Sequence, residues 1–128
     1  MSEAAKIVEV FLEALGRRDL DAAQEFLGCG FRMIATGGHV FASLSEFVAF
    51  SKDRHKGAKK LIDSYDVIRD GEATIVYAIG SMSGTWNDGT KFDRVRYIDR
   101  FEVVYGKIVD MRIWSDLAEF RNKEKVIG

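Results

Sequence analysis

Hydrophobic residues recur at two different spacings along this chain, first that of a helix and later that of a strand. In residues 3–16 they return at every third or fourth position, which predicts a helix with Ser2 as its N-cap and Gly16 as its end. Residues 20–27 and 44–50 show the same spacing. Asp19 can cap the first of these helices, and Ser43 or Ser45 the second. The first half of the chain therefore predicts three helices.

The second half alternates between apolar and polar residues, which is the pattern of β-strands. The expected strands are 60–69, 72–86, 90–105 and 107–116, after two short ones at 31–36 and 39–41. Gly80 and Gly84 lie inside a long strand, where glycine often marks a bend. Helices followed by long consecutive strands predict an α+β domain, with three N-terminal helices covering one face of a curved antiparallel sheet. The charged tail, 117–128, is expected to form a frayed helix.

Composition narrows the class of protein. The chain has 128 residues, so residues 1–128 are expected to form one domain. Lys and Arg number 19 against 20 Asp and Glu, without the basic patch that nucleic-acid binding needs. The single Cys29 cannot form an internal disulfide, and no apolar run approaches the length of a membrane span. We expect a cytoplasmic protein without a membrane, nucleic acid or cofactor partner.

The two histidines, His39 and His55, lie far apart without acidic neighbours at ligand spacing, so no metal site is expected. His55 is expected near the end of the third helix, where the helix dipole favours its positive charge. His39 lies between turn-forming residues and could reach the mouth of a cavity.

Asp99 breaks the alternation of its strand. It shares a face with Tyr97, Phe101 and Val103, whereas the other face carries Arg100. An unpaired carboxylate among apolar side chains costs several kcal/mol, so Asp99 must find a partner or take up a proton. Two interpretations are open. Asp99 is either a catalytic acid or base in a pocket, or a structural carboxylate satisfied by an arginine or by backbone N–H groups.

A curved sheet covered by helices encloses a conical cavity. Alternation and helical spacing predict which side chains face it, and most of these can equally be core. The expected lining residues are Phe11, Leu15, Met33, Ala35, His39, Phe50, Tyr77, Tyr97, Met111 and Ile113, around Asp99.

RRDLDAAQEFL follows the first helix, GGHVF precedes the third, and IDRFEVVYGKIVDMRIW forms the final hairpin. This order resembles that of the nuclear transport factor 2-like superfamily, in its SnoaL-like and ketosteroid-isomerase-like branch. The resemblance covers nearly the whole chain and implies a cystatin-like roll with a cone-shaped pocket. It places Asp99 at the position of the isomerases' protonated aspartic acid. The isomerases' tyrosine position is Phe11 and their base position is Ala35, so the resemblance argues against ketosteroid isomerase activity. The acid of the cyclase and hydrolase branches is replaced by Ile113.

Three hypotheses follow. The chain is an acid–base enzyme (an isomerase, cyclase, dehydratase or hydrolase) acting on a mostly apolar or aromatic small molecule, with Asp99 assisted by Tyr97, Tyr77 or His39. Alternatively, it binds such a ligand without turnover. The third hypothesis, compatible with both, is a homodimer formed through the outer sheet face, which carries Arg100, Glu102, Arg112 and Trp114. A second titratable group within hydrogen-bond reach of Asp99, in a cavity, would favour the enzyme.

Overall fold

A computed structural model describes residues 2–121. The helices are α1 (Glu3–Gly16), α2 (Leu20–Gln24) and α3 (Leu44–Lys52). The strands are β1 (Leu27–Ile34), β2 (Val40–Phe41), β3 (His55–Asp70), β4 (Ala73–Trp86), β5 (Lys91–Val104) and β6 (Lys107–Ser115). Residues 117–121 are helical, and the rest of the expected tail helix lies outside the described residues. None of the helices in residues 2–121 is long and apolar enough to cross a membrane.

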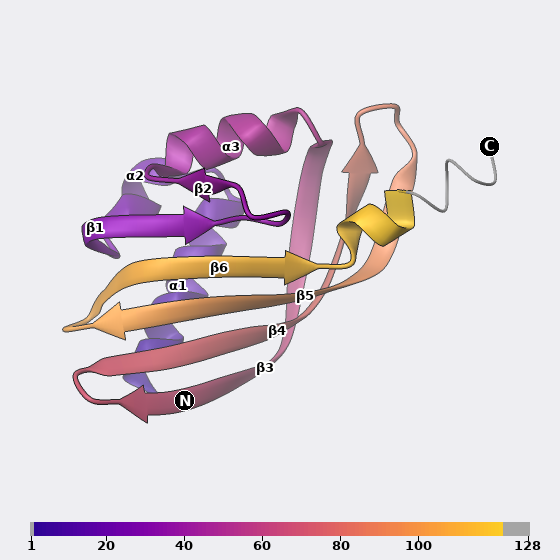
Figure 1. Ribbon diagram of the computed structural model, residues 1–128. Coiled ribbons are helices and arrows are strands. Elements are labelled where there is room, and N and C mark those ends of the chain that lie inside the picture. Colours follow the sequence, from indigo (N-terminus) through magenta and orange to yellow (C-terminus); the bar gives the residue numbers. More distant parts are fainter. Residues whose placement is uncertain (1, 122–128) are drawn as a thin grey trace.

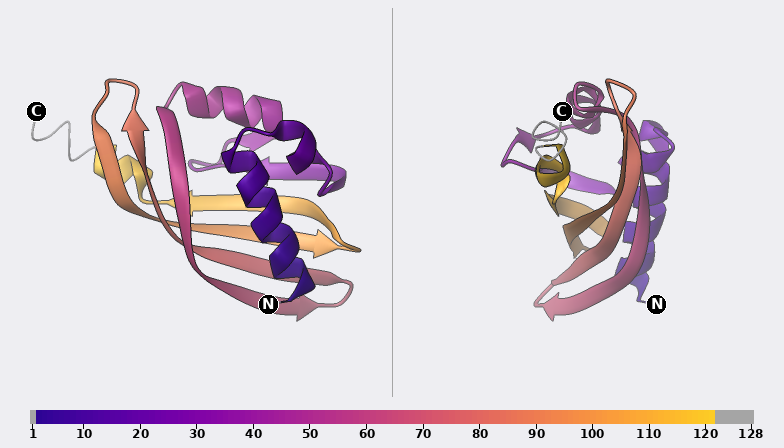
Figure 2. Two further views of the ribbon diagram at one scale, coloured as in Figure 1. Left: turned by 180° about the vertical axis from the view of Figure 1, so that it is seen from behind. Right: turned by 90° about the vertical axis from the view of Figure 1, so that its right-hand side faces the viewer.

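The six strands form one curved, unclosed sheet in the order β2-β1-β6-β5-β4-β3, with helices covering its concave side (Figures 1 and 2). This confirms the α+β architecture. The sheet is mixed, however, and the expectation of a purely antiparallel sheet is wrong in one place, because β1 pairs with β6 in parallel. β1 and β6 are not joined by a hairpin, so no turn forces them to run in opposite directions.

The three helices begin where the sequence predicts. The hydroxyl of Ser2 accepts a hydrogen bond from the Ala5 N–H at 3.1 Å. The Asp19 carboxylate and the Ser43 hydroxyl cap α2 and α3 in the same way. Each cap satisfies a backbone donor that the helix itself leaves free.

The second helix is shorter than its spacing predicts. α2 ends at Gln24, and Gly28 to Gly30 lie in β1 rather than ending a helix. The reason is pairing with β6, where the Ile108 N–H donates to the Phe26 carbonyl at 2.8 Å. Gly28 lies so close to β6 that a Cβ atom there would come within 2.9 Å of Val109. Tertiary pairing therefore decides the conformation of this segment.

Gly80 and Gly84 mark the bend of β4, as expected. A Cβ at Gly80 would overlap the Leu61 carbonyl of β3, and one at Gly84 would overlap the Gly57 carbonyl. The β3–β4 register shifts at both places, between Ile62 and Ser64 and between His55 and Gly57. The missing side chains let the two strands approach and curl together. This curl brings the first half of β3, still paired with β4, next to α3 (Figure 2).

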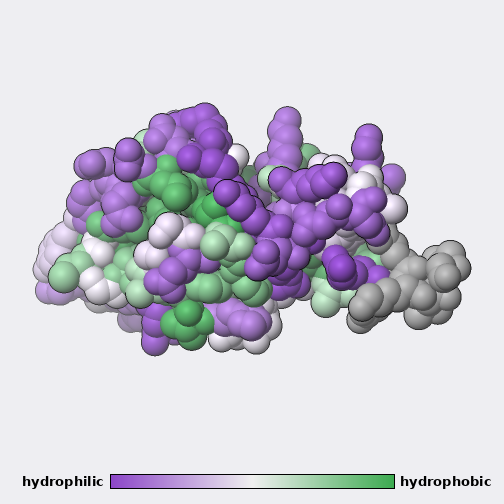
Figure 3. Space-filling view, turned by 90° about the horizontal axis from the view of Figure 1, so that it is seen from above, coloured by the Kyte–Doolittle hydropathy of each residue, from purple (hydrophilic) through white to green (hydrophobic). Residues whose placement is uncertain are grey.

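The surface above α3 is not uniformly polar. Seen from above, hydrophobic side chains gather over the half of the molecule that holds α2, α3 and β2, and hydrophilic side chains cover most of the other half (Figure 3). Val40 of β2 is one of the exposed large hydrophobic residues. The main core lies below, where α1 packs its Val8 and Phe11 against Val76 of β4 and Phe101 of β5.

Candidate active site

A cavity of about 1010 Å³ lies between α1, α3, the first half of β3 and the inner face of β6. It is large enough for a ring-containing small molecule. Its apolar wall consists of Leu12, Leu15, Ala35, Phe47, Phe50, Ala58, Ile62, Met82, Met111, Ile113 and Leu117. Its charged lining residues are Glu9, Glu13, Arg17, Arg18, Arg54, Lys59, Lys60 and Asp63. The cavity is thus an apolar chamber with ionisable groups on some of its walls.

Lys60 of β3 lines this cavity and forms an ion pair with Asp99 of β5. The Lys60 Nζ donates to the Asp99 Oδ2 at 2.5 Å. The Lys60 side chain is 26% exposed and lines the cavity, whereas the Asp99 side chain is fully buried behind it. The ammonium also lies 4.7 Å from the centre of the Tyr97 ring, a favourable cation–π distance. A ligand in the cavity would therefore meet Lys60 first.

Burial raises the pKa of Asp99 above its ordinary value, and the nearby Lys60 ammonium opposes this rise without cancelling it. The direction is the one expected for a carboxyl group that loses its water on burial. The other carboxylate oxygen, Oδ1, is buried and has no hydrogen-bond partner in residues 2–121. Burial and the Asp99 charge also raise the pKa of the Tyr97 hydroxyl, so this group stays protonated. Burial and the Lys60 ammonium thus act on the Asp99 carboxyl in opposite directions, since burial favours its neutral form and Lys60 its charged form.

The sequence contained a signal for Lys60. Ala58, Lys60 and Ile62 share one face of β3, so Lys60 breaks an apolar face just as Asp99 does on β5. Two charges of opposite sign on the wrong faces of strands in one sheet indicate a buried pair. An arginine was one of the partners expected for Asp99, but Arg96 and Arg100 of β5 lie on the opposite face of the strand from Asp99.

Five of the ten expected lining residues do line the cavity: Leu15, Ala35, Phe50, Met111 and Ile113. Phe11 and Met33 are fully buried in the core instead. The Phe11 ring and the Met33 side chain belong to the hydrophobic core. These two residues follow the alternative interpretation, in which the expected lining residues are core. Tyr97 is buried under Lys60, and its hydroxyl has no partner within the described chain.

Two expected lining residues lie elsewhere. Tyr77 is out of step with the buried Val76 and Ala78, so its side chain lies on the outer face of β4. His39 is exposed beside Phe50, with ring centres 4.8 Å apart, and is not among the residues that line the cavity. The placement of Tyr77 and His39 inside the cavity is therefore corrected, and neither can assist Asp99 from there.

His55 is the residue that sequence reasoning placed in the wrong element. It is the first residue of β3 rather than the end of α3, and it lines the cavity. Its Nδ1 is buried without a partner in the described part of the chain. Burial lowers the pKa of His55, and the positive charges of Arg18 and Arg54 lower it further. Tyr65 is a second missed residue, and burial followed by Glu9 and Glu13 raises its pKa to about 12.

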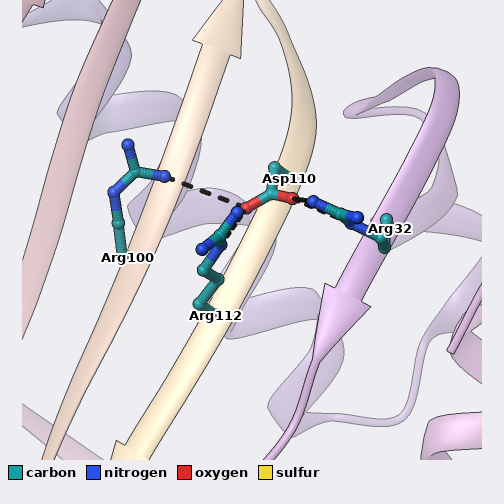
Figure 4. A network of polar contacts seen from close by, with 4 residues as sticks. All are labelled: Arg32, Arg100, Asp110 and Arg112. Atoms are coloured by element: carbon teal, nitrogen blue, oxygen red, sulfur yellow. Dashed lines mark hydrogen bonds and ion pairs between the residues drawn. The ribbon is translucent and has the colours of Figure 1, made fainter. Parts of the chain in front are cut away.

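A separate polar cluster lies on the outer face of the sheet. The Asp110 carboxylate of β6 is surrounded by Arg32 of β1, Arg112 of β6 and Arg100 of β5 (Figure 4). The nitrogen–oxygen distances are 3.2 Å to Arg32, 3.0 Å to Arg112 and 3.9 Å to Arg100. Alternation places Arg100, Asp110 and Arg112 on the charged outer face, whereas Arg32 joins them only because β1 pairs with β6 and brings Arg32 opposite Asp110.

No protein-family model matches the chain, and no curated protein does. Solved structures do match. A nuclear transport factor 2-like protein of unknown function from Burkholderia pseudomallei is 22% identical, with 94% of this chain and 95% of that chain covered and a TM-score of 0.75. The chain has the nuclear transport factor 2-like fold.

Other proteins with this fold carry more specific descriptions. TerC, co-crystallised with polyporic acid, is 16% identical over 94% of this chain and 97% of its own, with a TM-score of 0.76. A candidate SnoaL-like polyketide cyclase from Jannaschia is 19% identical over 93% of this chain and 89% of its own, with a TM-score of 0.70. At these identities the nuclear transport factor 2-like fold is shared, and the chemistry must be argued from the site.

Proposed function

We propose that this chain binds a small, mostly apolar molecule in the cavity and acts on it by acid–base chemistry through Lys60 and Asp99. The observation that carries the proposal is the Lys60–Asp99 contact at 2.5 Å, with Lys60 lining the cavity. It is a second titratable group within hydrogen-bond reach of Asp99. Perturbed carboxyl groups that contact a charged partner in a cavity are typical of catalytic sites.

The two groups would have different tasks. The Lys60 ammonium faces the cavity and can donate a hydrogen bond or proton to a carbonyl or enolate oxygen of the ligand. Asp99 lies behind Lys60, fixes the ammonium in place and can exchange a proton with it. Because the surrounding wall is apolar, the attraction between the ammonium and a developing oxyanion is stronger than it would be in water. This division supports an isomerase or lyase type of reaction, in which charge develops on an oxygen atom.

One observation favours non-catalytic binding as the second candidate function. Asp99 does not line the cavity itself, so in this conformation a ligand would touch Lys60 and not the carboxylate. Lys60 would then only orient an oxygen atom of the ligand. The cavity and its apolar wall serve this alternative equally well.

Both candidates can be tested with the full chain. A panel of polycyclic ketones and phenols should raise the melting temperature, and a ligand at 100 times its dissociation constant adds about 2.7 kcal/mol to the free energy of unfolding. Proton exchange at carbon atoms next to the carbonyl can be followed by nuclear magnetic resonance in D₂O. Lys60→Met should abolish this exchange, whereas Lys56→Met, on an exposed lysine of the same strand outside the cavity, should not change it.

The outcomes separate the two functions. If no compound changes the melting temperature, ligand binding in the cavity is refuted. If compounds bind but exchange does not depend on Lys60, the acid–base function is refuted and non-catalytic binding remains.

We also propose that two copies of the chain pair through the outer sheet face. Trp114 is 51% exposed there and Ile98 is 39% exposed, beside the arginine cluster around Asp110. Exposed aromatic residues together with arginines are typical of the centre of an interface.

A further inference from the structure

One end of the cavity carries three cationic or potentially cationic side chains. Arg18 follows α1, Arg54 follows α3, and His55 begins β3 directly after it. All three line the cavity. The Arg18 guanidinium is oriented by a hydrogen bond to the Leu15 carbonyl at 2.9 Å, and the Arg54 guanidinium lies 5.2 Å from the centre of the Phe50 ring. Both guanidiniums are thus positioned by contacts that leave their charge unbalanced.

The other lysine and arginine side chains at this site mostly have an acidic partner. Lys60 pairs with Asp99, and Arg17 lies 3.9 Å from Asp19. Within residues 2–121, by contrast, no carboxylate lies within 4.0 Å of Arg18 or Arg54. Burial lowers the pKa of Arg54, and the positive charge of Arg121 lowers it further.

The pKa of His55 is affected by the same positive charges. Its ring packs 6.0 Å from the ring of Phe92, and its Nδ1 is buried without a partner in the described part of the chain. After burial itself, the groups that disfavour its protonation are Arg18 and Arg54. The two guanidinium groups and the imidazole are therefore close enough to interact electrostatically, and all three line the cavity.

We propose that this end of the cavity binds the oxyanion group of an organic acid whose apolar body fills the rest of the cavity. The inference rests on ligand binding in this cavity, as proposed above, and adds the chemical class of the ligand. Guanidinium groups are well suited to carboxylates, because their N–H donors match two oxygen atoms at once. An anion between Arg18 and Arg54 would supply the counter-charge that both side chains lack.

Acidic groups give the ligand a direction. Tyr65 lies farther along β3 than His55, and its pKa is raised first by burial and then by Glu9 and Glu13 of α1; all three residues line the cavity. An anionic group would be repelled from these carboxylates and attracted to the end at His55. The apolar body of the ligand would then lie against Leu12, Met82 and Ile113. Lys60, which lies between His55 and Tyr65 on β3, would face the middle of the ligand.

The test uses two probes of nearly equal size, 1-pyrenecarboxylic acid and the neutral 1-pyrenecarboxamide, whose pyrene fluorescence reports binding to the full chain. At pH 7 the acid is ionised, and it should bind about tenfold or more tightly than the amide. Arg18→Gln and Arg54→Gln should each reduce this acid-to-amide ratio about tenfold, while the amide binds as before. Arg69→Gln is the matched control, because it removes the same charge from an exposed residue of β3 outside this cavity.

Three other outcomes would contradict the proposal. Equal binding of the acid and the amide, unchanged by either substitution, overturns the anion site and leaves the cavity-binding function standing. A ratio that depends on Lys60→Met but not on the two arginines overturns it as well, because the anion would then sit at Lys60. If neither probe binds at high micromolar concentration, the anion site and ligand binding in the cavity both fail.

Discussion

The Lys60–Asp99 pair should respond unequally to the loss of its two members. Lys60→Met keeps the length of the side chain and removes its charge, which leaves the fully buried Asp99 carboxyl without a cation. Asp99→Asn leaves Lys60 without a counter-charge, but the lysine is 26% exposed and can turn into the cavity, where water reaches it. Lys60→Met should therefore be the more destabilising change at neutral pH.

The magnitudes follow from burial. Removing one partner of a buried ion pair costs about 3–5 kcal/mol when the remaining charge stays ionised. Asp99 can avoid part of this cost by taking up a proton, so we expect Lys60→Met to lower the free energy of unfolding by about 2–4 kcal/mol at pH 7. Asp99→Asn loses a charge-assisted hydrogen bond but no longer buries a charge, and should cost about 1 kcal/mol.

The pH dependence gives an independent check. Burial raises the folded-state pKa of Asp99 above the unfolded value of about 3.9, so the protonated form is the better tolerated one. Stability from this group is fully present below the unfolded pKa and is lost as pH rises through the folded one. Without the Lys60 charge the folded pKa should rise further. The deficit of Lys60→Met should therefore grow between pH 4 and pH 7.

The free energies of unfolding can be measured by urea denaturation at pH 4 and pH 7. The proteins compared are the wild type, both single variants, the double variant and the control Lys56→Met. The double variant should be more stable at pH 7 than Lys60→Met alone, because it removes the unpaired charge. The reasoning is refuted if Lys60→Met is no less stable than Asp99→Asn at pH 7, or if its deficit does not change with pH.

Three further predictions concern the sheet. Gly80→Ala should lower the free energy of unfolding by about 1–3 kcal/mol, since the new Cβ overlaps the Leu61 carbonyl. Gly16→Ala has open space around it and should raise the free energy of unfolding by about 0.5 kcal/mol. Thermal denaturation compares the two variants. Asp110→Asn should cost about 1.5–3 kcal/mol in urea denaturation, because three arginines lose their shared carboxylate. Trp114→Glu should shift the chain from dimer to monomer in sedimentation equilibrium, and a wild-type monomer at high micromolar concentration would contradict the proposed interface.

The sequence by itself determined most of the fold. Hydrophobic spacing located the three helices and the four long strands, because burial of one face imposes a period of 3.6 on a helix and of 2 on a strand. The caps at Ser2, Asp19 and Ser43 are local hydrogen bonds and were readable for the same reason. Alternation also placed Asp99 on the buried face of its strand, but left open whether a partner or a proton satisfies its carboxylate.

Tertiary structure decided what the local pattern leaves undetermined. Gly28 to Gly30 form a strand because β6 lies beside them, and Arg32 reaches Asp110 through the same pairing. Register is equally non-local. A bulge between β5 and β6 turns Ile108 into the core in place of Val109, against simple alternation.

The composition of the site was the least predictable part. Lys60 and Asp99 are 39 residues apart, and only the curl of β3 over β4 at Gly80 brings them into contact. Arg18, Arg54 and His55 lie at the ends of three different elements, whose meeting depends on how the helices pack on the sheet. Spacing along the chain reports which face a side chain occupies, whereas the distance between two faces is fixed only when the whole domain has folded.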